Sequence, residues 1–500
     1  MQPLQRLAAV DLGSNSFRLE IGVIEHGVFR RTEYLKETVR QGGGLDENRN
    51  LTPAAMQKGW ECLARFGERL AGFDADEVRA VATQTLREAR NRDEFLDRAN
   101  TLLGFPINVI SGREEARLIY QGVAHMLDST TERRLVMDIG GRSTELILGE
   151  GHTPKTMESF RVGSIAWSTR FFPEGQFTQR AFEVAEIAAK AVLDEALDLY
   201  QPDRWDVAYG SAGTVNAITE VLEGAGWEKG SITRAGLDWL VEKLIAAQSA
   251  DKLRLPGLRD DRRPIIGGGV SVIRAVFDLL GIETMHIAPG GLRHGLLCDM
   301  LGPHTGLEDL QTRSINRLAM KFNVDLAHGE RVGRVARTLL SQLFTSQSEP
   351  ERQRLLQKLE WAGQLHEVGV HISHSDSHKH GAYILDNADA MGFSLSEMHR
   401  LSLLVLGHRG KLRKLESAMS DPGLVMQMLA LRIAVILCHA RRDPDLDGFR
   451  LTWKKESQKV TVSVRNRWSD LYPQSAHLLR EEALAWAQIT DGLRLDTGSI

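Results

Sequence analysis

Residues 10–23 read VDLGSNSFRLEIGV and residues 137–150 read MDIGGRSTELILGE, which are two versions of one pattern. Each is an apolar run that ends in an acid, then a turn with glycine and a hydroxyl, then a second β-prone run. This order is typical of strand, turn and strand. The matched positions are Asp11 with Asp138, Gly13 with Gly140, Ser16 with Ser143, Leu19 with Leu146 and Gly22 with Gly149. The repeat predicts a duplicated domain.

The turn of each copy is suited to bind an anion. Glycine permits backbone conformations that other residues avoid, so successive N–H groups can converge on a phosphate, and the hydroxyl adds a donor. Two ordinary glycine-containing hairpins are the alternative, but the matched acid, glycine and hydroxyl favour a phosphate held in a cleft between two halves. The predicted phosphate-binding residues of the turns are Gly13, Ser14, Asn15, Ser16, Gly140, Gly141, Ser143 and Thr144.

The composition is that of an ordinary soluble globular protein, with 42% hydrophobic and 26% charged residues. With 500 residues the chain exceeds what one hydrophobic core supports, and three or four domains are expected. The 62 basic and 66 acidic residues give a net charge of −4. We therefore expect no DNA or RNA partner, and any polyanion has to be met by a local basic groove.

Three cysteines, Cys62, Cys298 and Cys438, lie far apart and form no CxxC pair. This spacing argues against a disulfide framework and a zinc ribbon and fits a reducing cytoplasm. The first residues lead straight into a strand without signal-peptide features, and no apolar stretch reaches the roughly 18 residues of a membrane span. We expect a cytoplasmic protein that is not inserted in a membrane.

Hydrophobic periodicity gives the first half three strands and then helix, strand, helix, strand and helix, and the second half repeats this order. Such alternation indicates an α/β fold with a mostly parallel core sheet. The turns GSAGT at 210–214 and PGGLRHG at 289–295 would bring backbone N–H groups and Arg293 to the same cleft. Tight packing without a ligand explains the first of these turns nearly as well. In the second half we expect strands at 134–139, 143–149, 156–162, 206–209 and 283–288 and a long helix at 178–199.

Residues 306–500 form a different module, in which helical periodicity dominates and short β-prone pieces occur near Leu451 and Val460. The stretch LHEVGVHISHSDSHKHGAYIL, residues 365–385, contains five histidines. Imidazoles this close could share a metal ion, but their spacing matches no zinc pattern. A polar helix junction or an interface is the favoured interpretation.

Hydrolysis of a phosphate chain needs a positioned water and a group that accepts its proton. Glu114 and Glu115 stand side by side after the SG turn at 111–112, at the start of a predicted helix. Adjacent helical residues point in different directions, so only one of the two can face the cleft squarely. Acids in a first turn also complement the helix dipole, which accounts for one of the pair without catalysis. Spacing alone does not choose between them.

Asp11, Asp138 and Glu145 are candidate ligands for Mg²⁺, which prefers a few carboxylates together with phosphate oxygens and water. Arg18 has in the first hairpin the place that Glu145 has in the second. This asymmetry suits a site that attracts a polyanion and also holds a cation. The arginines expected to fork onto phosphate oxygens are Arg18, Arg87 and Arg293.

The motifs, in this order, resemble the exopolyphosphatase and guanosine pentaphosphate phosphohydrolase family. They are VDLGSNSFRL, ATQTLREARN, VISGREEARLIYQGV, MDIGGRSTELILGE, GSAGT and GGLRHGLL, followed by LHEVGVHISHSDSHKHGAYIL in the tail. The resemblance implies the α/β class, with a duplicated actin-like, ribonuclease H-like ATPase fold, an interdomain cleft and a mainly α-helical HD-like C-terminal module. It also implies dependence on Mg²⁺ and processive removal of terminal phosphate.

The same resemblance implies roles for individual residues. The second glutamate of the family's SGxEEA motif acts as general base, and it corresponds to Glu115. Phosphate contacts are implied for Arg18, Arg87 and Arg293, and an acidic cluster for Asp138 and Glu145. The implied domains are two actin-like domains at 1–125 and 126–305, the HD-like domain at 306–440 and a small α+β subdomain at 441–500.

The departures from the family's pattern include SAGT for ASGT at 211–214, GLRHG for GLREG with His294, and the following two. DIGGGSTE of the family is DIGGRSTE here, so that Arg142 takes the place of a glycine and either adds a phosphate contact or narrows the loop. The helical module resembles metal phosphohydrolases that carry an adjacent His-Asp pair, and the pair here is His366-Glu367. A role in dimerisation or as a substrate channel is the expectation for this module.

The first hypothesis for the function is an exopolyphosphatase, which releases orthophosphate from inorganic polyphosphate with Mg²⁺, and a homodimer is expected. The alternative within the family is a guanosine pentaphosphate 5′-phosphohydrolase. The HSDSHKH stretch favours the first. The alternative of another class is a non-catalytic regulator that binds polyphosphate, guanosine polyphosphates or ATP through the same cleft.

Overall fold

The computed structural model describes residues 6–25, 28–127, 131–301, 307–344, 348–454, 459–488 and 494–498. The chain divides into two compact units, Met1–Gly306 (unit 1) and Leu307–Ile500 (unit 2). The expected boundary between residues 305 and 306 lies outside the described residues, and the finer division into four domains stays a prediction. Among the described residues, no helix combines the length and the apolar character needed to cross a membrane.

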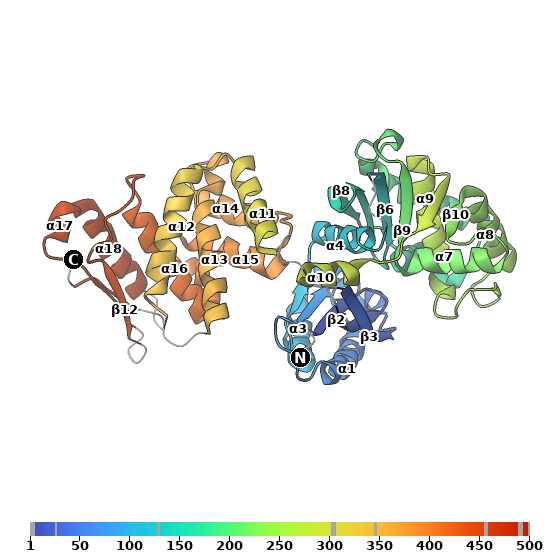
Figure 1. The fold of residues 1–500 in the computed structure, drawn as a ribbon, viewed down its shortest axis with the longest axis horizontal. Helices are drawn as coiled ribbons and strands as arrows, with labels where there is room; N and C mark the ends of the chain where they lie inside the picture. Colours follow the sequence, from blue (N-terminus) through green and yellow to red (C-terminus); the bar gives the residue numbers. More distant parts are fainter. Residues whose placement is uncertain are drawn as a thin grey trace. The chain divides into compact units, whose positions relative to one another are not determined.

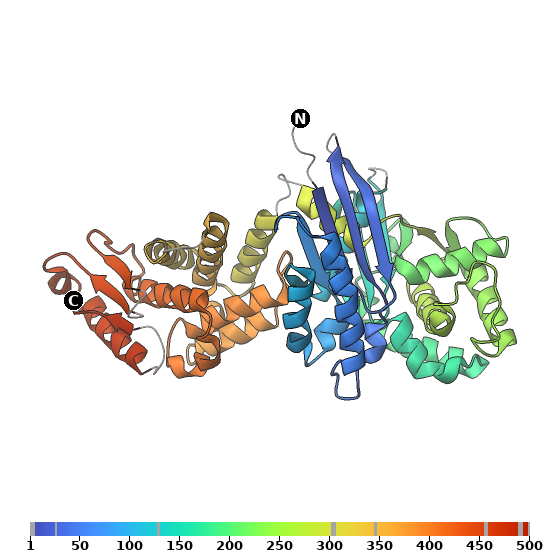
Figure 2. The same ribbon diagram turned by 90° about the horizontal axis from the view of Figure 1, so that it is seen from below.

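The first half of unit 1 contains β1 (Arg6–Leu12), β2 (Phe17–Glu25), β3 (Val28–Glu37), α1 (Pro53–Arg69), β4 (Val78–Ala82), α2 (Gln84–Glu88), α3 (Arg92–Leu103), β5 (Ile107–Val109) and α4 (Gly112–Ala124). The strands form one sheet in the order β3-β2-β1-β4-β5. The first three are antiparallel, and β4 and β5 continue the sheet in parallel with β1. Figure 2 shows the long blue strands side by side.

The second half contains β6 (Arg133–Ile139), β7 (Thr144–Glu150), β8 (Thr153–Phe160), α5 (Ser164–Phe171), α6 (Gln179–Leu193), β9 (Val207–Ser211), α7 (Ala212–Gly224), β10 (Ser231–Thr233), α8 (Arg234–Ala247), α9 (Ile266–Leu280), β11 (Thr284–Ile287) and α10 (Leu292–Leu301). The sheet order is β10-β11-β9-β6-β7-β8. In Figure 1, α7, α8 and α9 gather beside this sheet. Helix α10 returns to the first half, where Leu296 and Leu297 pack in one cluster with Leu7 and Leu118.

The two sheets repeat one another in detail. Asp11 pairs with Arg18 across β1 and β2, and Asp138 pairs with Glu145 across β6 and β7. The register of both second strands shifts at a glycine, at Gly22 in β2 and at Gly149 in β7. Gly149 has to be a glycine because a Cβ at this position would lie 2.1 Å from the Tyr120 ring. The expected duplication and the α/β class are therefore confirmed.

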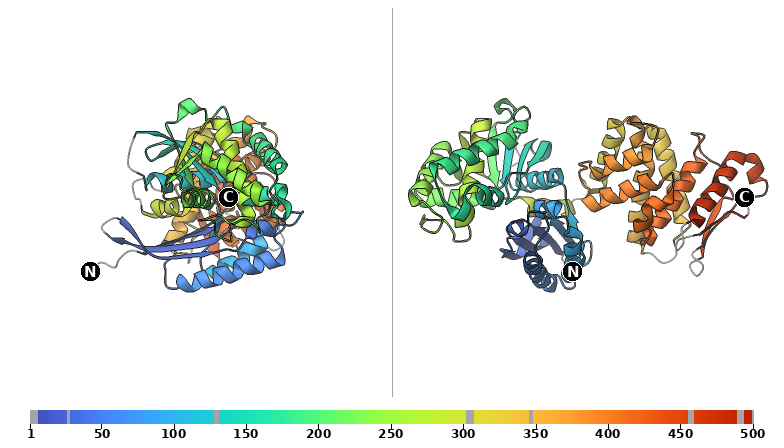
Figure 3. Two further views of the ribbon diagram at one scale, coloured as in Figure 1. Left: turned by 90° about the vertical axis from the view of Figure 1, so that its right-hand side faces the viewer. Right: turned by 180° about the vertical axis from the view of Figure 1, so that it is seen from behind.

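Unit 2 contains α11 (Leu307–Lys321), α12 (Leu326–Ser341), α13 (Glu349–Leu365), the 3₁₀ turn η6 (Val368–His371), α14 (Ser377–Asp386), α15 (Leu395–Gly407), α16 (Pro422–Leu437), β12 (Arg450–Lys454), β13 (Lys459–Ser463), α17 (Trp468–Leu471), α18 (Pro473–Ala487) and β14 (Arg494–Asp496). The strands form a sheet in the order β12-β13-β14. Figure 3 shows this red C-terminal part together at one end of the unit. One core of buried apolar side chains continues from the helices into this part, where it includes Trp468 and Trp486.

Two helical segments differ from the expectation. The long helix expected at 178–199 ends at Leu193 and is followed by a 3₁₀ turn, Asp194–Ala196. Helix α5 was not expected, because SIAWSTRF contains β-branched, hydroxyl and aromatic residues with modest helix propensity. Its formation depends on tertiary packing, with Ile165 and Trp167 buried.

Candidate functional site

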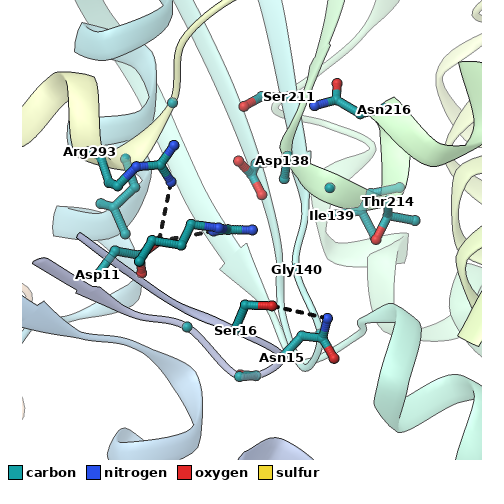
Figure 4. A pocket seen from close by; sticks show the side chains of 18 of the residues that line it. Asp11, Asn15, Ser16, Asp138, Ile139, Gly140, Ser211, Thr214, Asn216 and Arg293 are labelled. Carbon is teal, nitrogen blue, oxygen red and sulfur yellow. Dashed lines mark hydrogen bonds and ion pairs between the residues drawn. The ribbon is translucent and has the colours of Figure 1, made fainter. Parts of the chain in front are cut away.

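A pocket of about 380 Å³ is lined by residues of both halves of unit 1. Figure 4 shows Asp11 and Arg293 on one side of it, Asn216 and Thr214 on the other, and Asp138 between them. The predicted site residues that line it are Asp11, Gly13, Ser14, Asn15, Ser16, Arg18, Glu115, Asp138, Gly140, Gly141 and Arg293. Those that are not part of the lining are Arg87, Ser143, Thr144 and Glu145.

The two glycine-containing turns have the same local geometry. A Cβ on Gly13 would lie 3.1 Å from the carbonyl oxygen of Ser16, and a Cβ on Gly140 would lie 3.1 Å from that of Ser143. The turns also approach each other, since a Cβ on Gly141 would lie 3.1 Å from the Cβ of Ser14. Both backbones therefore reach the same pocket, as the repeat predicts.

Ser143 and Thr144 support their turn from inside the protein. Thr144 Oγ1 donates to the Val162 carbonyl oxygen at 2.6 Å, and the Ser143 carbonyl oxygen accepts from the Gly140 N–H at 2.9 Å. Both residues are buried. The structure thus places these two predicted phosphate contacts behind the pocket wall.

The adjacent glutamates at the start of α4 have different surroundings. Glu115 lines the pocket, and its Oε2 accepts from Arg87 Nη1 at 2.7 Å. Glu114 accepts from Arg117 with both carboxylate oxygens, each at 2.9 Å, and Arg117 also donates to Asp299 at 2.5 Å. Glu114 therefore belongs to a buried ion-pair network, and Glu115 is the carboxylate that faces the pocket.

The acids at the pocket lie close enough to raise one another's pKa. Burial, together with the charges of Glu115 and Asp11, raises the pKa of Asp138 to about 7. Burial, Glu115 and Asp138 raise the pKa of Glu145 well above its usual range. The pKa of Glu115 is raised by burial although the Arg87 charge opposes the shift. Burial is the first cause of all three shifts, and a neighbouring carboxylate adds to each of them.

Carboxylates suit a hard divalent cation, and Asp11 and Asp138 line the pocket, whereas Glu145 does not. A cation such as Mg²⁺ binds carboxylate oxygens, and its charge would relieve the mutual repulsion of the acids. The three residues that would hold it come from β1, β6 and β7, and Asp138 and Glu145 are neighbours across two antiparallel strands. Glu145 accepts from Ser159 Oγ at 2.7 Å, which fixes its carboxylate. The ligand set Asp11, Asp138 and Glu145 stays a prediction.

Two of the three predicted arginines line the pocket. Arg18 Nη1 donates to Asp11 Oδ2 at 3.0 Å, as expected for neighbours on one face of β1 and β2. Arg293 Nε donates to Glu20 Oε2 at 3.1 Å, and its Nη1 lies 3.7 Å from Asp11 Oδ2. Arg87 donates to Glu115 and, at 2.9 Å, to the Ile110 carbonyl oxygen. Its position indicates a role in holding Glu115.

A second group of positive charges was not predicted from the sequence. Lys36, Arg259 and Arg262 line the pocket. Burial and the charges of Arg262, Arg18 and Arg259 together lower the pKa of Lys36 to about 8. In the described structure, the buried Nε of Arg262 has no hydrogen-bond partner. Lys36 pairs with Arg18 across β2 and β3, so both side chains lie on the same face of the sheet. The signal in the sequence was the alternation of side chains along β3, which assigns Lys36 to the face of the pocket.

Arg142, the departure in the second turn, connects the two halves of unit 1. Its guanidinium donates to Glu88 Oε2 at 2.6 Å and 3.0 Å and to the Gly42 carbonyl oxygen at 2.9 Å. Arg142 is not part of the pocket lining. The side chain therefore ties the second turn to the first half.

Comparisons with known proteins identify the family of the chain. Residues 23–304 match the Ppx/GppA phosphatase family, and residues 310–485 match Ppx/GppA phosphatase, domain III. A guanosine-5′-triphosphate,3′-diphosphate pyrophosphatase of Vibrio atlanticus is 39% identical over 481 residues, which cover 95% of each chain. The protein of the same name in Vibrio vulnificus is 37% identical over 478 residues, again with 95% of each chain covered.

Two solved structures show the same fold. An exopolyphosphatase from Cytophaga hutchinsonii has a TM-score of 0.54 at 23% identity and covers 59% of this chain and 98% of its own. The Aquifex aeolicus PPX-GPPA enzyme has a TM-score of 0.51 at 23% identity and covers 59% of this chain and 99% of its own. The expected fold is thus confirmed. By its sequence matches, the chain belongs to the Ppx/GppA phosphatase family, hydrolases that act on phosphoric anhydrides.

Proposed function

We propose that this chain removes the terminal 5′-phosphate of guanosine pentaphosphate, which is guanosine 5′-triphosphate 3′-diphosphate. The two Vibrio relatives carry this substrate in their name, and each alignment covers 95% of both chains. This reverses the order of the two substrates that the sequence analysis favoured. The structure named exopolyphosphatase is 23% identical and therefore supports the fold alone.

The observation that carries the proposal is the second group of positive charges in the pocket. Guanosine pentaphosphate has two separate phosphate groups, and a site for it needs cations beyond those that hold the triphosphate. In the proposed complex, the 5′-triphosphate binds at the two turns with Arg18 and Arg293. The 3′-diphosphate binds at Lys36, Arg259 and Arg262, which also line the pocket.

The guanine base has polar partners available in the same pocket. Asn216 and Glu220 lie one helical turn apart on α7 and both line the pocket. A carboxylate accepts hydrogen bonds from the two adjacent N–H groups of guanine, and an amide can donate to its carbonyl oxygen. We infer that these two side chains select the base.

In the proposed reaction, Glu115 accepts a proton from a water molecule that attacks the γ-phosphorus. The bond between the γ-phosphorus and the β,γ-bridging oxygen breaks, and its electron pair leaves with guanosine 5′-diphosphate 3′-diphosphate. The other product is orthophosphate. Arg87 holds the Glu115 carboxylate at 2.7 Å, and the backbone N–H groups of the turns would stabilise charge on the transferred phosphoryl group.

We propose Mg²⁺ as the cation of this site, held by Asp11, Asp138 and Glu145. A divalent metal ion is general in this phosphatase family. When bound, Mg²⁺ would neutralise charge on the phosphate oxygens. The acids that hold it would then be fully ionised, because the cation lowers the pKa values that burial and repulsion raise.

We also propose that the protein acts in the cytoplasm as a homodimer. The free cysteines Cys62, Cys298 and Cys438 fit a reducing compartment. Light scattering on the purified chain tests the dimer, and a monomer at micromolar concentration would contradict it.

The proposed function is tested by orthophosphate release from guanosine pentaphosphate, GTP and long-chain polyphosphate, with Mg²⁺ and matched concentrations of terminal phosphate. GTP differs from guanosine pentaphosphate only by lacking the 3′-diphosphate. Arg262→Gln should therefore lower kcat/KM for guanosine pentaphosphate at least about tenfold and leave that for GTP nearly unchanged. The matched control is Arg254→Gln, which changes an exposed arginine of the same segment outside the pocket.

Two results would contradict the proposed function. Equal losses for GTP and guanosine pentaphosphate in Arg262→Gln would show that Arg262 does not bind the 3′-diphosphate. Turnover of polyphosphate far above that of guanosine pentaphosphate would restore the exopolyphosphatase hypothesis.

A further inference from the structure

Four buried histidines meet at helix ends in unit 2. They are His328 near the start of α12, His366 directly after α13, His378 near the start of α14 and His408 directly after α15. Their exposed fractions are 6%, 3%, 8% and 5%, respectively. Histidine is intermediate in its tendency to be buried, so four neighbouring buried imidazoles form an unusual core.

The rings form a row with a carboxylate beside it. The centroids of the rings of His328 and His366 are 5.4 Å apart, as are those of His366 and His408, and those of His378 and His408 are 6.4 Å apart. Glu367 follows His366 in the chain. One ligand atom from each of His328, His366 and Glu367 lies within 4.8 Å of the others.

Backbone carbonyls orient two of the rings. His366 Nδ1 lies 2.7 Å from the Gly363 carbonyl oxygen, and His408 Nδ1 lies 2.6 Å from that of Val405. A carbonyl oxygen only accepts, so Nδ1 carries the hydrogen in both rings and Nε2 keeps its lone pair. Metal-binding histidines have this arrangement, with the second N–H held by a carbonyl or carboxylate oxygen.

A further imidazole of the row has an unused polar atom. His378 is buried, and its Nδ1 has no hydrogen-bond partner in the described part of the chain. An imidazole nitrogen without a partner in a protein interior carries a cost in free energy. The row is thus not fully satisfied by the protein itself.

Arg441 holds the acidic side of the cluster. Its Nη2 donates to Glu367 Oε1 at 2.6 Å and its Nη1 to Asp325 Oδ2 at 2.9 Å. Asp325 also accepts from the His328 N–H at 3.0 Å and so caps α12. The Arg441 side chain is 51% exposed and that of Glu367 is 23% exposed. The guanidinium can therefore leave Glu367 for water while an ion reaches the cluster from the same side.

We propose that His328, His366 and Glu367 bind a divalent transition-metal ion such as Zn²⁺ or Co²⁺, in exchange with Arg441. Two imidazoles and a carboxylate are a common ligand set for these borderline ions, whereas Mg²⁺ prefers oxygen ligands alone. The site lies within unit 2 and is separate from the phosphate pocket of unit 1. Of the five histidines in the sequence stretch, His366 is the proposed ligand, and His371, His374, His378 and His380 are not. The spacing of histidines within residues 365–385 could not reveal the ligand His328, because His328 lies outside that stretch.

The test uses the full chain, stripped of metal with a chelator and titrated with Co²⁺ in the presence of excess Mg²⁺. Excess Mg²⁺ occupies sites made of oxygen ligands alone. The readouts are the visible absorption of bound Co²⁺, the metal content per chain and Tm. The wild-type chain should bind one Co²⁺ with histidine-dependent bands, and its Tm should rise.

Three variants identify the ligands. His328→Gln, His366→Gln and Glu367→Gln should each weaken Co²⁺ binding by roughly tenfold to a hundredfold or more. The matched control is His399→Gln in the same unit, because the His399 side chain is 60% exposed and pairs with Asp386. Equal binding by the wild type and the His366→Gln variant, or no histidine-dependent bands in the wild type, would overturn the proposal.

The variant Arg441→Met tests the exchange without touching a buried imidazole. It removes the cation that competes for Glu367, so Co²⁺ should bind several times more tightly. Unchanged or weaker binding in a variant with wild-type circular dichroism would contradict the exchange. This readout does not depend on hydrolysis, so its failure is distinct from a failure of the proposed function.

Discussion

Arg87 Nη1 lies 2.7 Å from Glu115 Oε2, and this ion pair favours the ionised form of the proposed base. Burial raises the pKa of Glu115, whereas the Arg87 charge and hydrogen bond lower it. Arg87 does not line the pocket, although the sequence analysis expected it to contact phosphate. We therefore infer that Arg87 positions Glu115, the proposed base.

Arg87→Met should move the acidic limb of the pH profile. Loss of the cation removes a contribution that lowers the pKa of Glu115, so the base becomes protonated at a higher pH. The fall of kcat/KM on the acidic side should shift to higher pH, with KM changed little. The measurement is kcat/KM against pH, with Arg90→Met as the control because Arg90 is exposed in the same segment. An unchanged limb with a large rise in KM would instead indicate direct phosphate binding.

Glu115→Gln should lower kcat by about 10²-fold to 10⁴-fold, because it removes the proton acceptor and keeps the shape of the side chain. Glu114→Gln should act on stability, because Glu114 pairs with Arg117 in a buried network. Breaking such a pair costs up to about 3–5 kcal/mol. Steady-state kinetics and chemical denaturation separate the two effects. Equal kinetic losses in both variants would contradict the assignment of the base.

The adjacent glutamates show what the sequence could and could not predict. The repeat in the strands and turns depends on local patterns, so the duplication and most of the pocket lining were predictable. The roles of Glu114 and Glu115 depend on partners far away in the chain, and Asp299 is joined to Glu114 through both Arg117 and Arg79. Spacing along one helix contains no information on such partners.

The cations around Lys36 were missed for a similar reason. Lys36 lies on β3, whereas Arg259 and Arg262 belong to a segment without regular structure before α9. No local motif joins them, and only the fold brings them to one pocket. The alternation along β3 was the single local signal, and it is weak because exposed strands alternate in the same way.

Lys36 should give the pH profile its alkaline limb. Its pKa is lowered to about 8 by burial and by the charges of Arg262, Arg18 and Arg259, so it is protonated below this pH and neutral above it. A neutral amine holds phosphate less well. The value of kcat/KM for guanosine pentaphosphate should therefore fall as pH rises through about 8 in the wild type. Lys36→Arg keeps the charge and should remove this alkaline limb. An identical limb in the wild type and in Lys36→Arg would contradict the prediction.

Arg142→Gly, which restores the glycine of the family's pattern, should loosen the connection between the two halves of unit 1. It removes the hydrogen bonds to Glu88 and to the Gly42 carbonyl oxygen. Hydrogen bonds to charged groups contribute about 1.5–3 kcal/mol when buried, and partial exposure of this pair reduces the expected loss to about 1–2 kcal/mol. Chemical denaturation measures it, with Arg161→Gly as an exposed control. Equal stability of Arg142→Gly and the wild type would show that the tie contributes nothing.

Asp138 should make the metal-free protein less stable as pH rises. Its folded pKa is about 7 because of burial and the charges of Glu115 and Asp11, whereas an unfolded aspartate has a pKa of about 4. The folded state therefore binds more protons between these values, and stability falls with rising pH across this window. The raised pKa corresponds to a loss of roughly 4 kcal/mol in the free energy of unfolding at pH 8. Asp138→Asn should recover this loss in a chelating buffer and should give no gain near pH 4.

Added Mg²⁺ should stabilise the wild type at pH 8 and stabilise the variant much less, because the variant lacks one of the proposed ligands. Denaturation curves at both pH values measure the stability of each protein, with Asp93→Asn as the exposed control. The same pH dependence in the wild type and Asp138→Asn would contradict the raised pKa, and equal stabilisation of both proteins by Mg²⁺ would contradict the proposed place of the cation.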